Sequence, residues 1–263
     1  LMGGAHVYLP KFSGELFLEV AQRHRPTATV LPPTMLRMVM DTPNFADYDI
    51  SSFRIIYYGA SPMPESWIRD AMQLFPQARI CQGYGLTETA PILTVLDDQT
   101  HREAIQSGNI KHLKSAGRPV PDTWLRVVDV NGVDVPMGET GELIVKGPNV
   151  MNGYHQMPEA TGEALRDGWL YTGDIGSLDE EGYLYLLDRK KDMVITGGEN
   201  VSPVEVESCL SLHDNVAEVA VVGLPDERWG KIVTAFVKRR GSVTAEELDQ
   251  HCKTSGLANF RRP

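Results

Sequence analysis

The first 113 residues alternate between two spacings of apolar side chains. Some segments repeat them every three or four residues, as helices do, and others are short β-branched runs, as in buried strands. Residues 1–9 read as a turn that feeds a buried strand. The remaining expectations are helices at 13–25, 34–40 and 64–75, and strands at 27–31, 54–58 and 78–82. This order favours an α/β fold around a mainly parallel sheet.

Two loops follow neighbouring strands of this predicted sheet. Gly59-Ala60-Ser61-Pro62 comes after strand 54–58, and the loop 83–89 comes after strand 78–82. Open α/β sheets bind ligands at the carboxyl ends of their strands. The two loops therefore mark a candidate binding edge.

The pattern changes at about residue 114 and again near 191. Strands expected at 124–130, 142–146 and 183–187 are separated by Asn-Gly and Glu-Gly turns, which indicates a barrel-like subdomain. Beyond it we expect a small α+β domain, whose two helices open with capping boxes at Ser202 and Thr244. The expected strands there are 193–196, 216–222 and 232–237. The predicted domains are 1–113, 114–190 and 191–263, the first two forming one large domain.

Composition narrows the class of protein. The 263 residues carry a formal net charge of −10, which disfavours a non-specific nucleic-acid or anionic-membrane binder. No apolar run reaches transmembrane length, so we expect no integral membrane contact. Cys81, Cys209 and Cys252 form no metal-ligand pair or disulfide framework, which favours reduced thiols and a cytoplasmic location. Oligomeric state is not readable from these features.

Common catalytic motifs fail on spacing. Gly230-Lys231 lacks the phosphate-loop pattern, and Met63 replaces the second glycine of a nucleophile elbow. Glu88 stands where a dinucleotide-binding glycine would be required. The seven histidines show no metal-ligand spacing on one element.

The segment 82–91, Gln-Gly-Tyr-Gly-Leu-Thr-Glu-Thr-Ala-Pro, holds chemistry suited to a nucleotide. Gly83 and Gly85 let backbone N–H groups approach an anion, and Tyr84 offers a flat face to a base. Thr87 offers a hydroxyl to phosphate, and Glu88 a carboxylate to Mg²⁺, which prefers oxygen ligands. An ordinary Gly-rich turn is the alternative interpretation of the same residues.

The motif at 84–89 resembles the core motif of the adenylate-forming superfamily, which includes acyl-CoA synthetases, luciferases and peptide-synthetase adenylation domains. Further blocks resemble that family in the same order along nearly the whole chain. These blocks are 59–62, 141–145 with 153–154, 169–174, 188–192 and 197–203.

The resemblance implies a role for each matching residue. On the large domain, Tyr84 would stack on adenine, Thr87 would contact phosphate and Glu88 would bind Mg²⁺. Asp174 would accept hydrogen bonds from the ribose hydroxyls, although a turn aspartate after Gly173 is the alternative. The implied nucleotide set is completed by Gly59, Ala60, Ser61, Gln82, Gly83 and Gly85.

The resemblance also implies a mobile small domain. Arg189 would bind ribose or phosphate, with a solvated surface charge as the alternative. Lys191 matches the family's hinge position. Gly197 and Gly198 would flank a tunnel for the pantetheine arm of coenzyme A.

The implied reaction consumes ATP, Mg²⁺, coenzyme A and a small carboxylic acid, fatty or aryl. The acid and ATP would give an acyl-adenylate and pyrophosphate, and the CoA thiol would then displace AMP. Tyr57, Tyr58 and residues 89–91 would line the acid pocket by position. A carrier-protein acceptor, a luciferase-type oxidation and a non-catalytic nucleotide-binding fragment are the alternatives.

The chain departs from the family at both ends. The family's Ser/Thr/Gly-rich phosphate loop would precede residue 1, and its catalytic lysine would follow Arg261-Arg262-Pro263. We therefore expect this polypeptide alone to have little or no adenylating activity.

Overall fold

The computed structural model describes residues 3–61 and 63–263, so Pro62 of the first predicted loop lies outside the described residues. The chain divides into two compact units that interleave along the sequence, and each is described by itself. The first unit is Leu1–Arg126, Val145–Leu170 and Leu178–Tyr185, and the second is Val127–Ile144, Tyr171–Ser177 and Leu186–Pro263.

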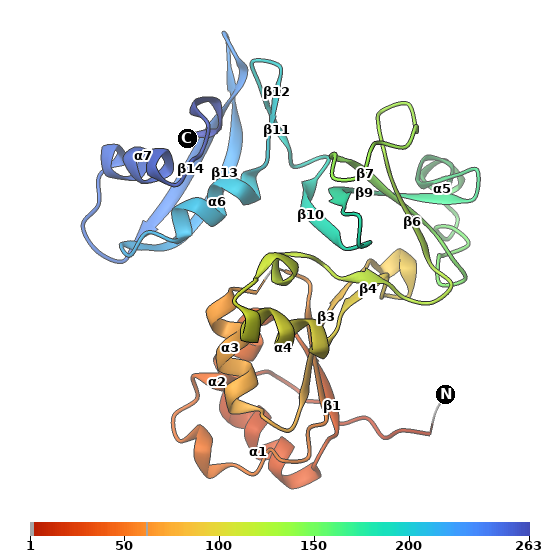
Figure 1. Ribbon diagram of the computed structural model, residues 1–263, viewed down its shortest axis with the longest axis vertical. Coiled ribbons are helices and arrows are strands. Elements are labelled where there is room, and N and C mark those ends of the chain that lie inside the picture. The colour runs from red at the N-terminus through yellow and green to blue at the C-terminus, as the bar shows by residue number, and fades with distance from the viewer. Residues whose placement is uncertain (1–2, 62) are drawn as a thin grey trace. The chain divides into compact units, whose positions relative to one another are not determined.

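The first unit contains a five-stranded sheet with the order β1-β2-β3-β4-β5 (Figure 1). Strands β1, β2 and β3 are parallel, whereas β4 pairs antiparallel with both β3 and β5. The α/β expectation is confirmed, and the sheet is mixed because β4 runs antiparallel to both of its neighbours. Its elements are α1 (Gly14–His24), β1 (Ala28–Leu31), α2 (Pro33–Met40), β2 (Ile55–Gly59), α3 (Glu65–Leu74), β3 (Arg79–Tyr84), β4 (Thr94–Leu96), α4 (Asp98–Ser107), β5 (Arg118–Pro119) and α5 (Pro158–Ala164).

Local signals explain where α1 begins and ends. Ser13 accepts a hydrogen bond from the Leu16 N–H at 3.2 Å, and Arg25 closes the helix in the left-handed conformation. Leu18 is fully buried against the core, where the rings of Phe17 and Phe53 stack at 5.8 Å. The prediction of a buried strand within residues 1–9 is wrong. Residues 3–9 form no strand, and Tyr8 is 83% exposed.

A second sheet has the order β10-β9-β7-β6, with β8 paired to β9, and its strands contribute residues to both units. Only residues 179–183 join β9 to β10, which is too short for a crossover and makes this pair antiparallel. This order has two end strands, β10 and β6, so the described sheet is open. The barrel-like subdomain expected from the sequence is thus a sheet that does not close on itself in the described residues. Its strands are β6 (Trp124–Val128), β7 (Gly141–Lys146), β8 (Leu165–Arg166), β9 (Trp169–Leu178) and β10 (Leu184–Arg189).

The end of the second unit is the expected small α+β arrangement. Two antiparallel hairpins, β11 with β12 and β13 with β14, accompany helices α6 and α7 (Figure 1). The sequence pattern missed β12, which immediately follows the Gly197-Gly198 turn. The elements are β11 (Val194–Thr196), β12 (Glu199–Val201), α6 (Pro203–Ser211), β13 (Val216–Asp226), β14 (Gly230–Arg239) and α7 (Ala245–Thr254).

Of the two predicted capping boxes, one forms completely. The Thr244 hydroxyl accepts from the Glu247 N–H, and the Glu247 carboxylate accepts from the Thr244 N–H. At α6, Ser202 accepts from the Glu205 N–H at 3.2 Å, but the Glu205 carboxylate pairs with Arg261 at 2.7 Å instead. A hydrogen bond to a charged guanidinium is stronger than one to a neutral backbone N–H. The bond from the Ser202 N–H to the Glu205 carboxylate, the second half of the predicted box, is therefore absent.

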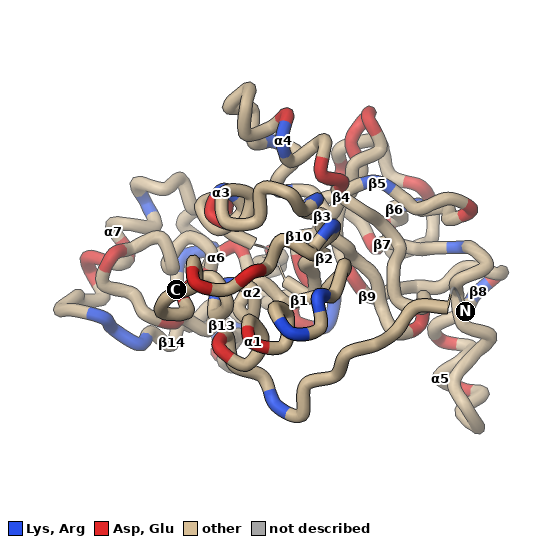
Figure 2. The backbone as a smooth tube through the Cα atoms, turned by 90° about the horizontal axis from the view of Figure 1, so that it is seen from below, with Lys and Arg blue, Asp and Glu red and all other residues tan. Residues whose placement is uncertain are grey.

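Acidic and basic residues are interspersed along the backbone of each unit (Figure 2). Among the described helices, none is long and apolar enough to cross a bilayer. All three cysteines are buried and unbridged.

Candidate functional site

The two predicted ligand loops do leave neighbouring parallel strands. Gly59 ends β2 directly opposite Gly83 on β3. The next residue, Ala60, is exposed and has φ +70°, a left-handed conformation that non-glycine residues rarely adopt. Ser61 is also exposed. Backbone strain at an exposed loop next to a strand end is a feature of functional sites, and the sequence did not reveal it.

Gly85 is required by close packing of the backbone. A Cβ atom at this position would lie 1.9 Å from the Pro91 carbonyl oxygen and 2.9 Å from the Leu93 nitrogen. The Leu93 N–H also donates to the Tyr84 carbonyl at 2.7 Å. The motif therefore folds back on itself, and this glycine's identity serves the fold whether or not an anion binds.

The two threonines of the motif have different environments. A short 3-10 turn, Thr87–Thr89, follows β3 in place of the predicted plain loop. Thr89 is fully buried, and its hydroxyl hydrogen-bonds the Leu86 N–H and carbonyl, each at 2.9 Å. Thr87 is exposed. Thr89 thus stabilises the turn, and Thr87 is the hydroxyl presented to solvent.

Glu88 is fixed at two points by one later segment. Its Oε1 accepts a hydrogen bond from the Tyr154 hydroxyl at 2.8 Å, and its carbonyl accepts from the Met151 N–H at 2.8 Å. The hydrogen bond to Glu88 also raises the pKa of Tyr154. Oε2 of Glu88 meets no donor in the part of the chain that the structure describes. A carboxylate with one uncommitted oxygen, beside the Thr87 hydroxyl, fits the oxygen ligands that Mg²⁺ prefers.

Gln82 belongs to a buried polar chain. Its side-chain amide lies 3.4 Å from the Tyr58 hydroxyl, which lies 2.8 Å from Nε2 of His101. Tyr58 is 1% exposed and His101 is fully buried, and this burial raises the pKa of the tyrosine and lowers that of the histidine. Tyr58, placed by sequence along an acid pocket, is thus part of the first unit's core.

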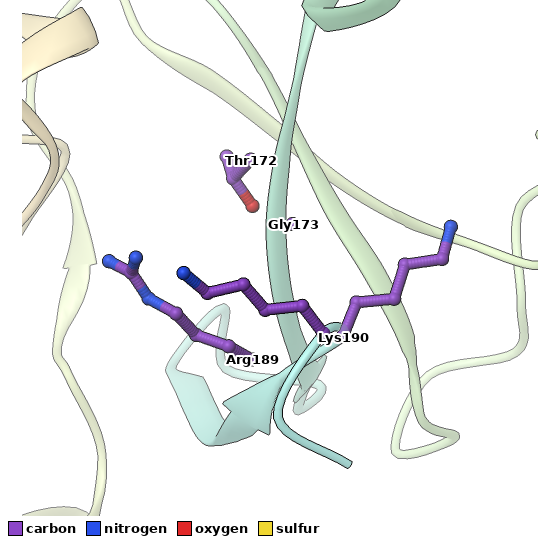
Figure 3. Close-up of a pocket in the computed structure, with 5 residues that line it drawn as sticks. Thr172, Gly173, Arg189 and Lys190 are labelled. Carbon is purple, nitrogen blue, oxygen red and sulfur yellow. The ribbon is translucent and has the colours of Figure 1, made fainter.

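A separate group of predicted residues lies within the second unit. Asp174 is 6% exposed, and its Oδ1 lies 3.3 Å from Nε of Arg189. Arg189 also lines a hollow of about 370 Å³, together with Thr172, Gly173, Lys190 and Lys191. Figure 3 shows Arg189 and Lys190 next to the Thr172-Gly173 segment of β9. A buried carboxylate and an exposed guanidinium beside a hollow suit a ligand with hydroxyl and anionic groups.

The predicted hinge residue, Lys191, comes two positions after Arg189 in the sequence. Lys191 is exposed, whereas its neighbour Lys190 donates from its backbone N–H to the Gly173 carbonyl and from Nζ to Glu142, both at 2.8 Å. Gly197 and Gly198, with φ +58° and +88°, form the two-residue turn between β11 and β12. Positive φ at both central residues is the type I′ hairpin geometry, so the turn itself requires these glycines.

Sequence reasoning missed several residues around these groups. Tyr154 lies in the matched 153–154 block but received no role, and His101 carried no motif. The Asp188 carboxylate accepts from the Ser202 hydroxyl at 2.7 Å and from the Val204 N–H at 3.3 Å, across the predicted hinge. The aspartate at 188 was visible only as part of a polar segment, because its partner lies fourteen positions away.

The α/β architecture of this chain matches that of adenylate-forming enzymes. More particularly, the chain belongs to the AMP-binding enzyme family. The family's main model matches residues 1–155, and the model of the AMP-binding enzyme C-terminal domain matches residues 205–263.

Curated relatives share a similar level of identity. The chain is 39% identical over 247 residues to a medium/long-chain-fatty-acid–CoA ligase, FadD8, of Mycobacterium tuberculosis, covering 94% of this chain and 42% of that protein. It is 43% identical over 239 residues to an indoleacetate–CoA ligase of Aromatoleum aromaticum, covering 90% and 45%. The chain thus spans about half the length of the curated relatives it matches.

Solved structures of the same class are similar throughout. The amide bond synthetase McbA of Marinactinospora thermotolerans matches with a TM-score of 0.85 and 33% identity, over 97% of this chain and 50% of that one. The o-succinylbenzoate CoA synthetase MenE of Bacillus subtilis, in complex with ATP and magnesium ion, matches with a TM-score of 0.81 and 35% identity, over 96% and 50%.

Proposed function

We propose that this chain is the nucleotide-binding part of an AMP-forming acid–CoA ligase. The observation that carries the proposal is the position of the 84–89 motif, which begins at Tyr84, the last residue of β3, beside the loop that follows β2. This is the edge where open α/β sheets bind ligands. Relatives named as fatty-acid– and indoleacetate–CoA ligases support the reaction class.

The proposal assigns roles to residues of this chain. Tyr84 stacks on adenine, and the loop Gly59, Ala60 and Ser61, with Gln82 and Gly83, follows the base edge. Thr87 donates to phosphate, and Glu88 holds Mg²⁺, which supplies charge neutralisation when bound. The residues orient the acid carboxylate and the α-phosphate for attack, so that positioning and electrostatics provide the catalysis.

The remaining roles fall on residues of the second unit. Asp174 accepts from ribose hydroxyls, and Arg189 donates to ribose or phosphate. Lys191 is the hinge about which the small domain turns between the adenylation and thioester-forming steps. Gly197 and Gly198 form a turn without side chains beside the pantetheine arm. The domain ranges 1–113, 114–190 and 191–263 are part of this proposal.

The acid is proposed as fatty or aryl, the two chemistries in the names of the relatives. The acceptor is proposed as CoA. An acceptor other than CoA is the second candidate, because the similar structure McbA is named an amide bond synthetase.

The test has two parts. Isothermal titration calorimetry with AMP and Mg·ATP measures whether the purified chain binds nucleotide, and no binding would contradict the proposal. ATP–pyrophosphate exchange by the chain alone is expected at or near zero. CoA-dependent AMP release by the protein of the whole natural reading frame, across a panel of fatty and aryl acids, then identifies the acid. AMP release with amines but not with CoA would favour the second candidate.

A further inference from the structure

The segment that follows β7 holds the turn of the 84–89 motif from one side. The Asn149 side-chain amide donates to the carbonyls of Thr89 and Ile92 at 3.2 and 3.0 Å. The Met151 N–H donates to the Glu88 carbonyl at 2.8 Å. These bonds join positions about sixty residues apart, all within the first unit, so the two segments form one fixed substructure.

Tyr154 is in turn fixed by helix α5. Its backbone N–H donates to the Thr161 hydroxyl at 3.0 Å, and that hydroxyl donates to the Met157 carbonyl at 2.8 Å. The threonine side chain also packs against Gly153, where a Cβ would lie 2.7 Å from its methyl group. The backbone that carries the phenol is therefore held in place where the phenol meets Glu88.

We propose that Tyr154 is a positioning residue for Glu88. This inference rests on the proposed role of Glu88 in holding Mg²⁺. The phenol O–H donates to Oε1 at 2.8 Å, which fixes the rotation of the carboxylate and leaves Oε2 as its uncommitted oxygen. A carboxylate that swings freely must lose that freedom when a cation binds, whereas a pre-oriented one has already lost it.

The first experiment asks whether the contact contributes to the folded state without any ligand. Denaturant unfolding is measured for the wild-type chain, Tyr154→Phe, Glu88→Ala and the double variant. The two effects are expected to be non-additive, with Tyr154→Phe shifting the unfolding midpoint in the wild-type background but not after Glu88→Ala. Additive shifts would overturn the proposed contact.

The second experiment asks whether the contact serves the cation. ATP affinity is measured by calorimetry with Mg²⁺ and again in excess EDTA. Tyr154→Phe is expected to weaken ATP binding about tenfold with Mg²⁺ and to leave the EDTA value unchanged, since loss of a partner that orients a metal ligand typically costs this much. The matched control Tyr8→Phe, at an exposed tyrosine of the same unit, should match wild type in both conditions.

The outcomes separate the inference from the function on which it rests. Suppose that Glu88→Ala removes the gain in ATP affinity that Mg²⁺ provides, while Tyr154→Phe leaves this gain intact. The positioning role of Tyr154 is then overturned, and the role of Glu88 stands. If Glu88→Ala also leaves the effect of Mg²⁺ unchanged, the proposed function of Glu88 fails and the inference fails with it. If Tyr154→Phe weakens ATP binding in EDTA as much as it does with Mg²⁺, Tyr154 is a merely structural residue.

Discussion

Tyr58 donates its phenol proton to Nε2 of His101 across 2.8 Å in the core of the first unit. The direction follows from the other ring nitrogen, which lies 2.7 Å from the Asp97 carbonyl and must carry a proton because a carbonyl only accepts. Burial lowers the pKa of His101 and keeps the ring neutral, so Nε2 is the acceptor. Oε1 of Gln82 lies farther from the phenol oxygen, at 3.4 Å, so the histidine is the closer acceptor for the single phenol proton.

Tyr58→Phe should therefore destabilise the chain. The substitution leaves Nε2 of His101 buried without a donor, which costs about 1–3 kcal/mol of unfolding free energy. Urea unfolding measures the loss. Tyr57→Phe is the matched control, because this neighbour on β2 is only half-buried and its hydroxyl has no partner in the described structure. Equal losses at both tyrosines would contradict the assignment.

The same histidine predicts a pH dependence of stability. Burial lowers the pKa of His101, partly offset by the Asp97 carbonyl and by the charges of Asp98 and Asp97. Below about pH 6.5 the unfolded chain takes up a proton that the folded chain does not, so stability is full above this pH and falls as the pH drops. Unfolding between pH 5 and 8 should show this slope, and His101→Gln should flatten it. A slope that persists unchanged in His101→Gln would contradict this account.

Gly85→Ala and Gly162→Ala should shift stability in opposite directions. A methyl at Gly85 would meet the Pro91 carbonyl oxygen at 1.9 Å, and such overpacking costs about 1–3 kcal/mol or more. Gly162 lies within α5, and a methyl there meets nothing within 4 Å, so alanine should add about 0.5–1 kcal/mol through helix propensity. Thermal denaturation compares the two variants, and a neutral Gly85→Ala would refute the steric account.

The start of α6 depends on a shared cap. Ser202 accepts from the Glu205 N–H and donates to Asp188, so Ser202→Ala should cost about 1 kcal/mol of unfolding free energy. Asp188→Ala should cost less once Ser202 is already alanine, because the two side chains act on the same helix end. Denaturant unfolding of the two single variants and the double variant measures this coupling. Ser211→Ala, at the exposed end of α6, provides the control.

Asp174 and Arg189 provide a test of the nucleotide role in the second unit. Asp174→Ala should weaken AMP binding at least tenfold, about 1.4 kcal/mol, because it removes a charged hydrogen-bond acceptor. Arg189→Lys should also weaken binding, since an ammonium lacks the planar fork of donors. Calorimetry with AMP measures both affinities. Lys190→Ala is the control for a neighbouring cation and is expected to change AMP affinity less than Arg189→Lys does. Unchanged affinity in Asp174→Ala would exclude the ribose contact.

Local features of this protein could be predicted from its sequence. The hydroxyls of Ser13 and Thr244 cap helices through partners three residues away, and the apolar spacing places β2, α3 and β3 correctly. The motif at 84–89 identifies the family because its residue types are contiguous. These signals depend on short stretches of chain, so neighbouring residues determine them.

The tertiary structure decided which distant groups meet. Tyr154 reaches Glu88 from 66 positions away, and Tyr58 reaches His101 from 43. Glu205 pairs with Arg261, 56 positions later, and does not form the capping bond to the Ser202 N–H that its spacing predicted. Such contacts form only after long loops close and the surrounding core excludes water, and no local pattern specifies that outcome. The sequence therefore identified the residue types of the candidate site, and the fold determined which of them orient one another.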